Sequence, residues 1–93
     1  MRYPFMTLED ETEVVHSEIL PDTQGNEHVR MNFERPVDGG FLTAECWLPE
    51  YRWTEVKGYS DAELLHLDRF LHRVAPIVID LAREGGFSCA AVV

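Results

Sequence analysis

Histidine, cysteine and acidic side chains are the groups of this chain that could bind a metal ion or a cofactor. Seventeen acids accompany four histidines and two cysteines, which are His16, His28, His66, His72, Cys46 and Cys89. A zinc site needs three or four ligands brought together, and two histidines share a helix face at a spacing of about four residues. His66 and His72 are six residues apart, whereas His72 follows Asp68 by four, the spacing of a surface ion pair. The pattern therefore predicts neither a metal site nor a cofactor.

No motif of the sequence indicates a catalytic centre. Cys46 lies among small and aliphatic residues of a predicted strand, which favours a buried thiol over a nucleophile, and the setting of Cys89 stays open. Among seventeen acids, a pair of carboxylates for acid–base chemistry could be found anywhere and carries no information. The sequence has no glycine-rich phosphate loop, nucleophile elbow or dinucleotide fingerprint. We assign no catalytic residue and expect that the protein is not an enzyme.

An aromatic cluster in the middle of the chain indicates binding instead. It lies within nineteen positions and consists of Phe41, Trp47, Tyr51, Trp53 and Tyr59. Strand alternation places Phe41 and Trp47 on the face opposite the aliphatic residues of the same strand. The favoured interpretation is that residues 3–8 fold back and cover these aromatics. The alternative is a partner protein, because aromatics rimmed by charge are typical of interface hot spots.

Two aliphatic residues suggest a second contact surface on the predicted C-terminal helix. Leu65 and Ile79 fall on its polar side, in a sparse stripe with His72 between them. Two exposed aliphatics are normal on a protein surface, so this stripe is a weak indication of a partner or dimer seam. The predicted partner-binding residues are thus Phe41, Trp47, Tyr51, Trp53, Leu65 and Ile79.

Charge restricts the classes of partner. The 93 residues carry a net charge of -9, which disfavours direct binding to nucleic-acid phosphates or anionic lipid. Residues 1–29 hold seven acids and one base, and we interpret residues 1–11 as a solvated acidic lead-in. The sequence shows neither a secretion signal nor a run of about 18 apolar residues. We expect one domain over residues 1–93, located in the cytoplasm.

Alternation of apolar and polar residues predicts three or four β-strands. The clearest is His28–Glu34, in which every second residue is apolar. Pro36 ends this strand, and Asp38, Gly39 and Gly40 favour a tight hairpin turn. The predicted strands are Thr12–Leu20, His28–Glu34, Phe41–Leu48 and, as a fourth, Tyr51–Val56.

A long helix is predicted from Asp61 to Glu84. Ser60 and Glu63 have the spacing of a capping box, and the glycines at 85 and 86 end the helix. Pro76 falls on the polar side, so we expect a bend around the sheet rather than two helices. Helical spacing gathers one apolar face from Leu64, Leu67, Phe70, Leu71, Val74, Ala75, Ile77, Val78, Leu81 and Ala82.

These elements together predict an α+β domain. It is an antiparallel three- or four-stranded meander followed by one long amphipathic C-terminal helix packed on one sheet face. Residues 87–93 are apolar and uncharged, and a short final strand there stays open.

Several segments of the sequence carry a resemblance. They are YPFMTLEDETEVVHSEI at 3–19, FERPVDGGFLTAECWLP at 33–49, GYSDAELL at 58–65 and AREGGF at 82–87. Together they resemble a group of short uncharacterised bacterial proteins, a domain of unknown function. The resemblance implies a stand-alone bacterial cytosolic protein, and it transfers neither an activity nor a site residue.

Three functional hypotheses follow. The first is a small acidic regulator or inhibitor that binds another protein, with a basic partner or a second copy of itself as candidates, through the aromatic sheet face or a strand edge. The second is a small enzyme or ligand-binding domain with a cleft between the sheet and the helix end, which uses His16 or His28 with nearby acids. The third is an acidic mimic of nucleic acid.

Overall fold

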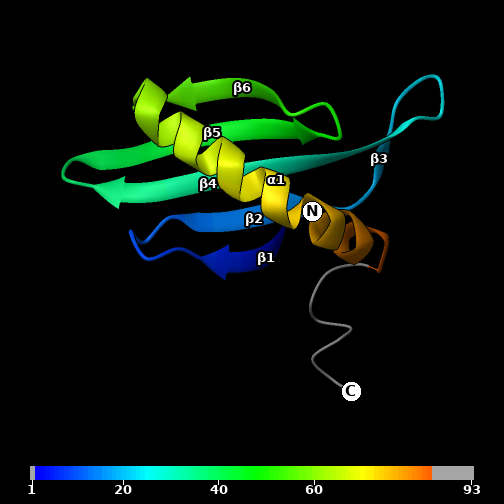
Figure 1. Ribbon diagram of the computed structural model, residues 1–93, viewed down its shortest axis with the longest axis horizontal. Coiled ribbons are helices and arrows are strands. Elements are labelled where there is room, and N and C mark those ends of the chain that lie inside the picture. The colour runs from blue at the N-terminus through cyan, green and yellow to red at the C-terminus, as the bar shows by residue number, and fades with distance from the viewer. Residues whose placement is uncertain (1, 85–93) are drawn as a thin grey trace, which may run out of the picture.

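The computed structural model describes residues 2–84, which form two layers, an antiparallel sheet and one helix across it (Figure 1). The elements are β1 (Arg2–Thr7), β2 (Glu13–Ser17), β3 (Leu20–Pro21), β4 (Glu27–Val37), β5 (Gly40–Leu48), β6 (Arg52–Lys57) and α1 (Asp61–Glu84). The strand order is β1-β2-β4-β5-β6, and the short β3 pairs with the start of β4. The predicted α+β meander with one long helix is therefore confirmed, with two strands more than expected.

The N-terminal segment differs from its prediction. Residues 2–7 of the expected lead-in form the edge strand β1, which pairs with β2 so that Tyr3 lies opposite His16. The Phe5 ring packs near Phe70 of α1, with 6.5 Å between the ring centroids. These two aromatics anchor β1 at the edge of the sheet away from β5. The expectation that residues 3–8 cover the central aromatics is therefore wrong.

The first predicted strand, Thr12–Leu20, is divided into β2 and β3. Ser17 provides the physical reason for the division. Its hydroxyl accepts a hydrogen bond from the Arg30 backbone amide at 2.9 Å and donates one to the Glu18 carbonyl at 2.7 Å. A side chain thus replaces a strand carbonyl, and regular pairing with β4 ends at this point.

The β4–β5 hairpin forms as predicted, but the prediction that Pro36 ends the first of its strands is wrong. β4 continues through Pro36 to Val37, and Pro36 lies opposite Phe41 at the hairpin end of the strand pair. Its register runs from Val29 opposite Leu48 to Val37 opposite Gly40, and Gly39 takes the left-handed turn conformation with φ 83°. Every second residue from Val29 to Phe33 and from Ala44 to Leu48 is buried, which confirms the predicted alternation. The predicted fourth strand is also present as β6.

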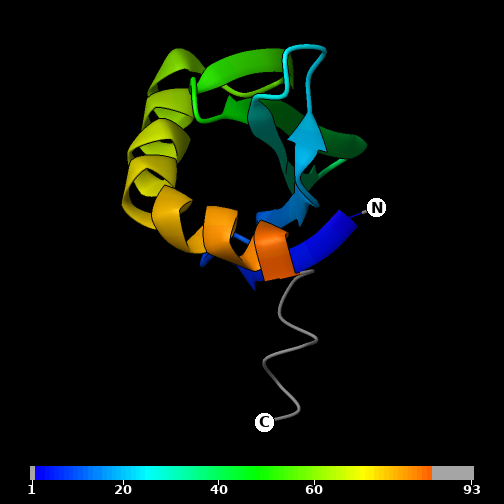
Figure 2. The same ribbon diagram turned by 90° about the vertical axis from the view of Figure 1, so that its right-hand side faces the viewer.

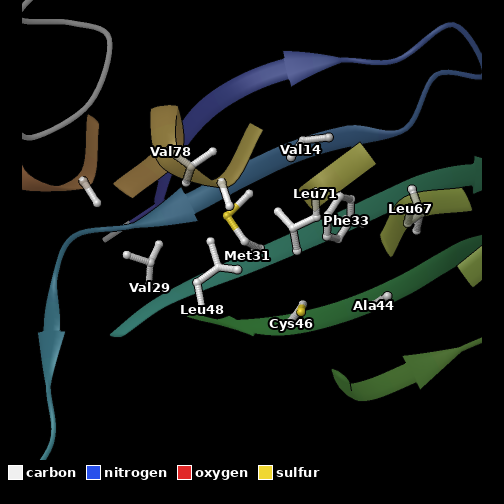
Figure 3. Close-up of a cluster of buried hydrophobic side chains, with 12 residues drawn as sticks. Val14, Val29, Met31, Phe33, Ala44, Cys46, Leu48, Leu67, Leu71 and Val78 are labelled. Atoms are coloured by element: carbon white, nitrogen blue, oxygen red, sulfur yellow. The ribbon is translucent and has the colours of Figure 1, made fainter. Parts of the chain in front are cut away.

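The core lies between α1 and the sheet face that α1 covers (Figure 3). Its strand residues include Val14, Val29, Met31, Phe33, Ala44, Cys46 and Leu48, and its helix residues include Leu67, Leu71, Ala75, Val78 and Ala82. Cys46 is a fully buried free thiol, as predicted, and burial raises its pKa to about 12. Such a thiol is not available as a nucleophile.

The helix begins at Asp61 and bends as predicted, whereas the glycines at 85 and 86 that are expected to end it lie outside the described residues. The Ser60 amide donates to Glu63 Oε1 at 3.0 Å, and the Glu63 amide donates to Ser60 Oγ at 3.2 Å, which completes the capping box. Pro76 lies inside a single helix that bends around the sheet (Figure 2). This helix is not apolar enough along its length to cross a membrane.

Two residues of α1 lie on the side opposite to their prediction. Ile77 is 54% exposed, whereas Ile79 is half-buried and packs against the core. The prediction assumed equal angular steps around a straight axis, but the helix curves around the sheet (Figure 2), and Ile79 lines a groove together with Val29 and Leu48. The possible final strand over 87–93 and the setting of Cys89 lie outside the described residues.

Candidate functional site

One face of the sheet has no helix or strand over it among residues 2–84 (Figure 2). We call it the open face. It alternates with the buried residues along each strand and carries Glu13, Val15, Arg30, Asn32, Glu34, Phe41, Thr43, Glu45, Trp47, Arg52 and Thr54. A hollow of about 320 Å³ lies on this face, around Val15, Asn32 and Glu45.

Trp47 is the large aromatic residue at the centre of one row across the open face. Arg30 on β4 and Arg52 on β6 are its cross-strand neighbours, and their guanidinium carbons lie 5.8 and 5.9 Å from the Trp47 ring centroid. Guanidinium groups at this distance are attracted by the π-electrons of the ring. Arg30 Nε also lies 3.7 Å from Glu45 Oε1. The indole is therefore held in place on the open face by charged neighbours.

Phe41 lies at the tip of the β4–β5 hairpin, on the same face as Trp47. It is 59% exposed, and its cross-strand partner is Pro36. Val37 beside it is also exposed, and Asp38 follows in the turn. The hairpin therefore presents an apolar tip next to an acidic side chain.

The other aromatics of the predicted cluster lie on the helix side of the sheet. The Trp53 ring packs against Phe33 at 5.5 Å between centroids, and its Nε1 donates to Asp68 on α1 at 2.9 Å. Tyr51 stacks on His72, with 3.7 Å between ring centroids, and Tyr59 packs against the core. Of the cluster, only Phe41 and Trp47 share the open face.

The pairing of β5 with β6 explains this division. Trp53 lies opposite the buried Cys46, so the two side chains share the covered face. The turn of residues 49–51 shifts the alternation between the strands, and odd-numbered residues thus change from the open face on β5 to the covered face on β6. Sequence parity alone could not show that shift.

The predicted stripe on α1 is not formed as a seam. Leu65 is 52% exposed on the outer surface of the helix, but Ile79 packs against the core. The structure therefore does not bring Leu65 and Ile79 together with each other or with Trp47.

A second concave site lies at the end of the sheet away from the Phe41 hairpin. This groove has a volume of about 580 Å³, and we call it the end groove. Its apolar residues are Ile19, Val29, Leu48, Pro49 and Ile79, and its polar residues are Asp22, Asn26, Glu27, His28, Glu50 and Arg83. It lies between the sheet and the C-terminal half of α1, where the second hypothesis placed a cleft.

His28 on the rim of the end groove is held by two carboxylates. Its Nε2 lies 3.0 Å from Asp22 Oδ2, and its Nδ1 lies 3.0 Å from Glu50 Oε1. The hydrogen bond to Asp22 is the main cause that raises the pKa of His28, with Glu50 adding to it. The same bond, with the amides of Asn26 and Gln24, lowers the pKa of Asp22 to about 2. His28 is thus favoured as an imidazolium that donates from both nitrogens.

His16, the other histidine of the second hypothesis, lies elsewhere. It is fully buried, its Nδ1 donates to the Ser17 carbonyl at 2.8 Å, and its ring lies 5.5 Å from that of Tyr3. It does not line the end groove. In the part of the chain that the structure describes, no three histidine, cysteine or acidic side chains are grouped to hold a metal ion.

We compared the chain with protein-family models, with curated proteins and with solved structures, and none of the three comparisons returned a match. The open face and the end groove are therefore the features from which a function can be inferred.

Proposed function

We propose that the protein is a non-enzymatic protein-binding module, a small acidic regulator or inhibitor whose binding surface is the open face. The observation that carries the proposal is Trp47, held between Arg30 and Arg52 on a sheet face that no element covers among residues 2–84. Tryptophan and arginine are the residues most enriched in interface hot spots. Phe41 extends the same surface to the hairpin tip.

The face is a better binding surface than either edge of the sheet. Both edge strands contain an irregularity: β1 shifts register between Pro4 and Met6, and β6 contains Glu55 with φ 52° where its pairing with β5 shifts. Bulges and proline at an edge hinder the addition of another strand. The strand-edge alternative of the first hypothesis is therefore disfavoured.

Charge supports a basic partner. The net charge is -9, and Glu9, Glu11 and Asp38 are exposed in the loops at the hairpin end of the sheet. Opposite charge on a partner accelerates association, and salt screens this effect beyond about 8 Å at physiological ionic strength. A homodimer, a cytoplasmic location and membership in the resembled bacterial group stay predictions.

Two substitutions on the open face test the proposal. The tagged protein and its Trp47→Ala/Phe41→Ala variant are used to capture proteins from lysate of the source cells, and each captured protein is then titrated in purified form. We expect the double variant to bind its partner at least about tenfold more weakly, since hot-spot residues contribute about 2 kcal/mol or more. Circular dichroism and urea unfolding should show an intact fold.

Two matched variants complete the design. Leu65→Ala removes a side chain that is 52% exposed, compared with 59% for Phe41, from the helix layer and should leave binding unchanged. Trp53→Ala removes a ring packed against the core and should lower the free energy of unfolding by about 2–4 kcal/mol. Unchanged binding by the Trp47→Ala/Phe41→Ala variant, or a loss that only Leu65→Ala causes, would contradict the proposal.

The enzyme alternative relied on His16 or His28 with nearby acids and is less well supported. His16 is fully buried and does not line the end groove. A base must accept a proton, but both ring nitrogens of His28 already face carboxylates at 3.0 Å. The nucleic-acid mimic needs rows of acids at phosphate-like spacing, whereas the open face interleaves Glu34 and Glu45 with Arg30 and Arg52. Neither alternative is supported as well as protein binding.

A further inference from the structure

The end groove adjoins the open face, because Trp47 and Arg52 line a smaller hollow together with the groove's rim residues Asp22, His28 and Glu50. Neither Trp47 nor Phe41 lines the end groove itself, so its role can be tested apart from the proposed function. Its floor is made by Val29 and Leu48, which are 2% and 0% exposed and belong to the core (Figure 3). Ile19 and Ile79 form half-buried walls from the segment after β2 and from α1. A volume of about 580 Å³ is in the range of small-molecule sites, which are mostly apolar with a few polar groups that fix orientation.

The rim of the groove carries more negative than positive groups. Asp22, Glu27 and Glu50 face two cations, His28 and Arg83. His28 is committed to Asp22 and Glu50 through both nitrogens, and Arg83 pairs with Glu27 at 3.3 Å. One oxygen each of Glu27 and Glu50 accepts no hydrogen bond from the described residues.

The pairing at Glu27 is open to exchange. The side chains of Glu27 and Arg83 are 52% and 56% exposed, so water screens their attraction, and such surface pairs contribute little to stability. A ligand cation can therefore approach Glu27 without first breaking a buried interaction. At Glu50 the second oxygen is available while the first stays on His28.

We propose that the end groove binds a small aliphatic amine, whose alkyl chain covers Leu48 and Ile79 while its ammonium group lies against the free carboxylate oxygens of Glu27 and Glu50. The apolar floor accounts for the chain, and the excess of carboxylates accounts for the charge. A carboxylate ligand of the same length would meet three acids on the rim, and a neutral alcohol could donate a hydrogen bond to them but would lack the attraction between opposite charges.

The test uses the full chain and n-hexylammonium chloride as the probe, with 1-hexanol and sodium hexanoate as length-matched comparisons. Amide chemical shifts are followed by two-dimensional NMR at pH about 7, where an alkylamine is charged. We expect saturable shifts at Val29, Leu48 and Ile79 with a Kd on the order of 1 mM, given the few atoms of the probe. Hexanol should bind about threefold to fivefold more weakly, and hexanoate should not saturate.

Variants show whether the carboxylates of the groove rim, rather than the net charge of the protein, attract the ammonium group. Glu27→Gln and Glu50→Gln should each weaken hexylammonium binding about threefold to fivefold. The hydrogen-bond partners of His28 are Asp22 and Glu50, so Glu50→Gln could move His28 as well as remove a charge. Glu27→Gln removes a charge without changing either partner of His28, and it therefore still tests the effect of charge. Glu9→Gln makes the same change in net charge from the distant β1–β2 loop and should have no effect, and neither should Phe41→Ala at the distant hairpin tip.

Four results would overturn the proposal. They are no saturable shift at the groove, equal affinity for hexanol, an equal loss of affinity in Glu9→Gln, and nuclear Overhauser contacts between residues 85–93 and Ile79 in the ligand-free protein. The last result would mean that the chain's own C-terminal segment occupies the groove.

Discussion

His28 holds two turns of the chain together. Asp22 belongs to the turn between β3 and β4, and Glu50 belongs to the turn between β5 and β6; each contacts one ring nitrogen at 3.0 Å. A neutral imidazole has a single N–H, so it can donate to only one of these carboxylates. The link between the two turns is therefore complete only when His28 is charged.

The pH dependence of stability follows from this link. Because the folded-state pKa of His28 is raised above its ordinary value near 6.5, its contribution is complete below that value and is lost as pH rises through the folded pKa. We predict that the free energy of unfolding, measured with urea from pH about 6 to 9, falls over this interval, and that His28→Gln flattens the fall. Asp22, with its pKa lowered to about 2, acts in the opposite sense and loses its contribution only as the solution becomes strongly acidic.

An NMR titration of the His28 ring provides the direct control. Removing one carboxylate with Glu50→Gln should bring its pKa closer to the ordinary value, because one of the two bonds to the charged form is gone. If the free energy of unfolding of His28→Gln changed with pH as steeply as that of the unchanged protein, the contacts of His28 with the two carboxylates would not be the cause of the pH dependence.

At the scale of elements, local backbone geometry decides how β6 leads into α1. Gly58 has φ 89°, and a Cβ added to it would lie 2.5 Å from Cδ2 of Leu42 on β5. The connection therefore needs glycine twice over: for its left-handed backbone and for the close approach of Leu42. Leu42 therefore leaves no room for a side chain at the point where the chain leaves the sheet for the helix.

Gly58→Ala should lower the free energy of unfolding by about 1–3 kcal/mol, as measured by urea unfolding. Gly25→Ala is a matched control, because Gly25 has a similar φ of 84° but no atom within 4 Å of the added Cβ. We expect the control to lose less, since it has only the backbone cost. Equal losses would mean that the Leu42 contact is relieved by side-chain movement.

For the molecule as a whole, one helix covers one face of the sheet and an excess of acids is spread over the surface. The two layers bury the core on one side only, which leaves the open face and, adjoining it at one end of the sheet, the end groove. Ion pairs link distant segments, for example Arg35 with Asp10 and Glu63, but the net charge stays at -9. Self-repulsion of this kind opposes the compact state.

Added NaCl should therefore stabilise the protein. Screening shortens the reach of each charge from about 30 Å at 0.01 M to about 3 Å at 1 M, and we predict a rise of Tm by about 2–5 °C between low and high salt in thermal unfolding. Glu9→Gln/Glu11→Gln should show a smaller rise, because it removes two exposed acids from the same loop. A Tm that falls with NaCl would mean that ion pairs outweigh the repulsion.

The sequence by itself determined the elements whose signals are local. The helix from Asp61 to Glu84, its capping box and the β4–β5 hairpin follow from spacing over a few residues. The alternation of apolar and polar residues along β5 also correctly placed Trp47 and Cys46 on different faces of the sheet. Periodicity works here because each residue's face depends only on its neighbours in the chain. The buried state of Cys46 follows from the same pattern.

Tertiary structure alone decided the features that depend on distant partners. β1 is a strand because β2 offers it an edge, and Trp53 is covered because its pairing with Cys46 follows a turn that shifts parity. His28 and Glu50 meet across 22 positions of sequence to form the rim of the end groove. Such contacts depend on long-range register and packing, which local periodicity does not encode.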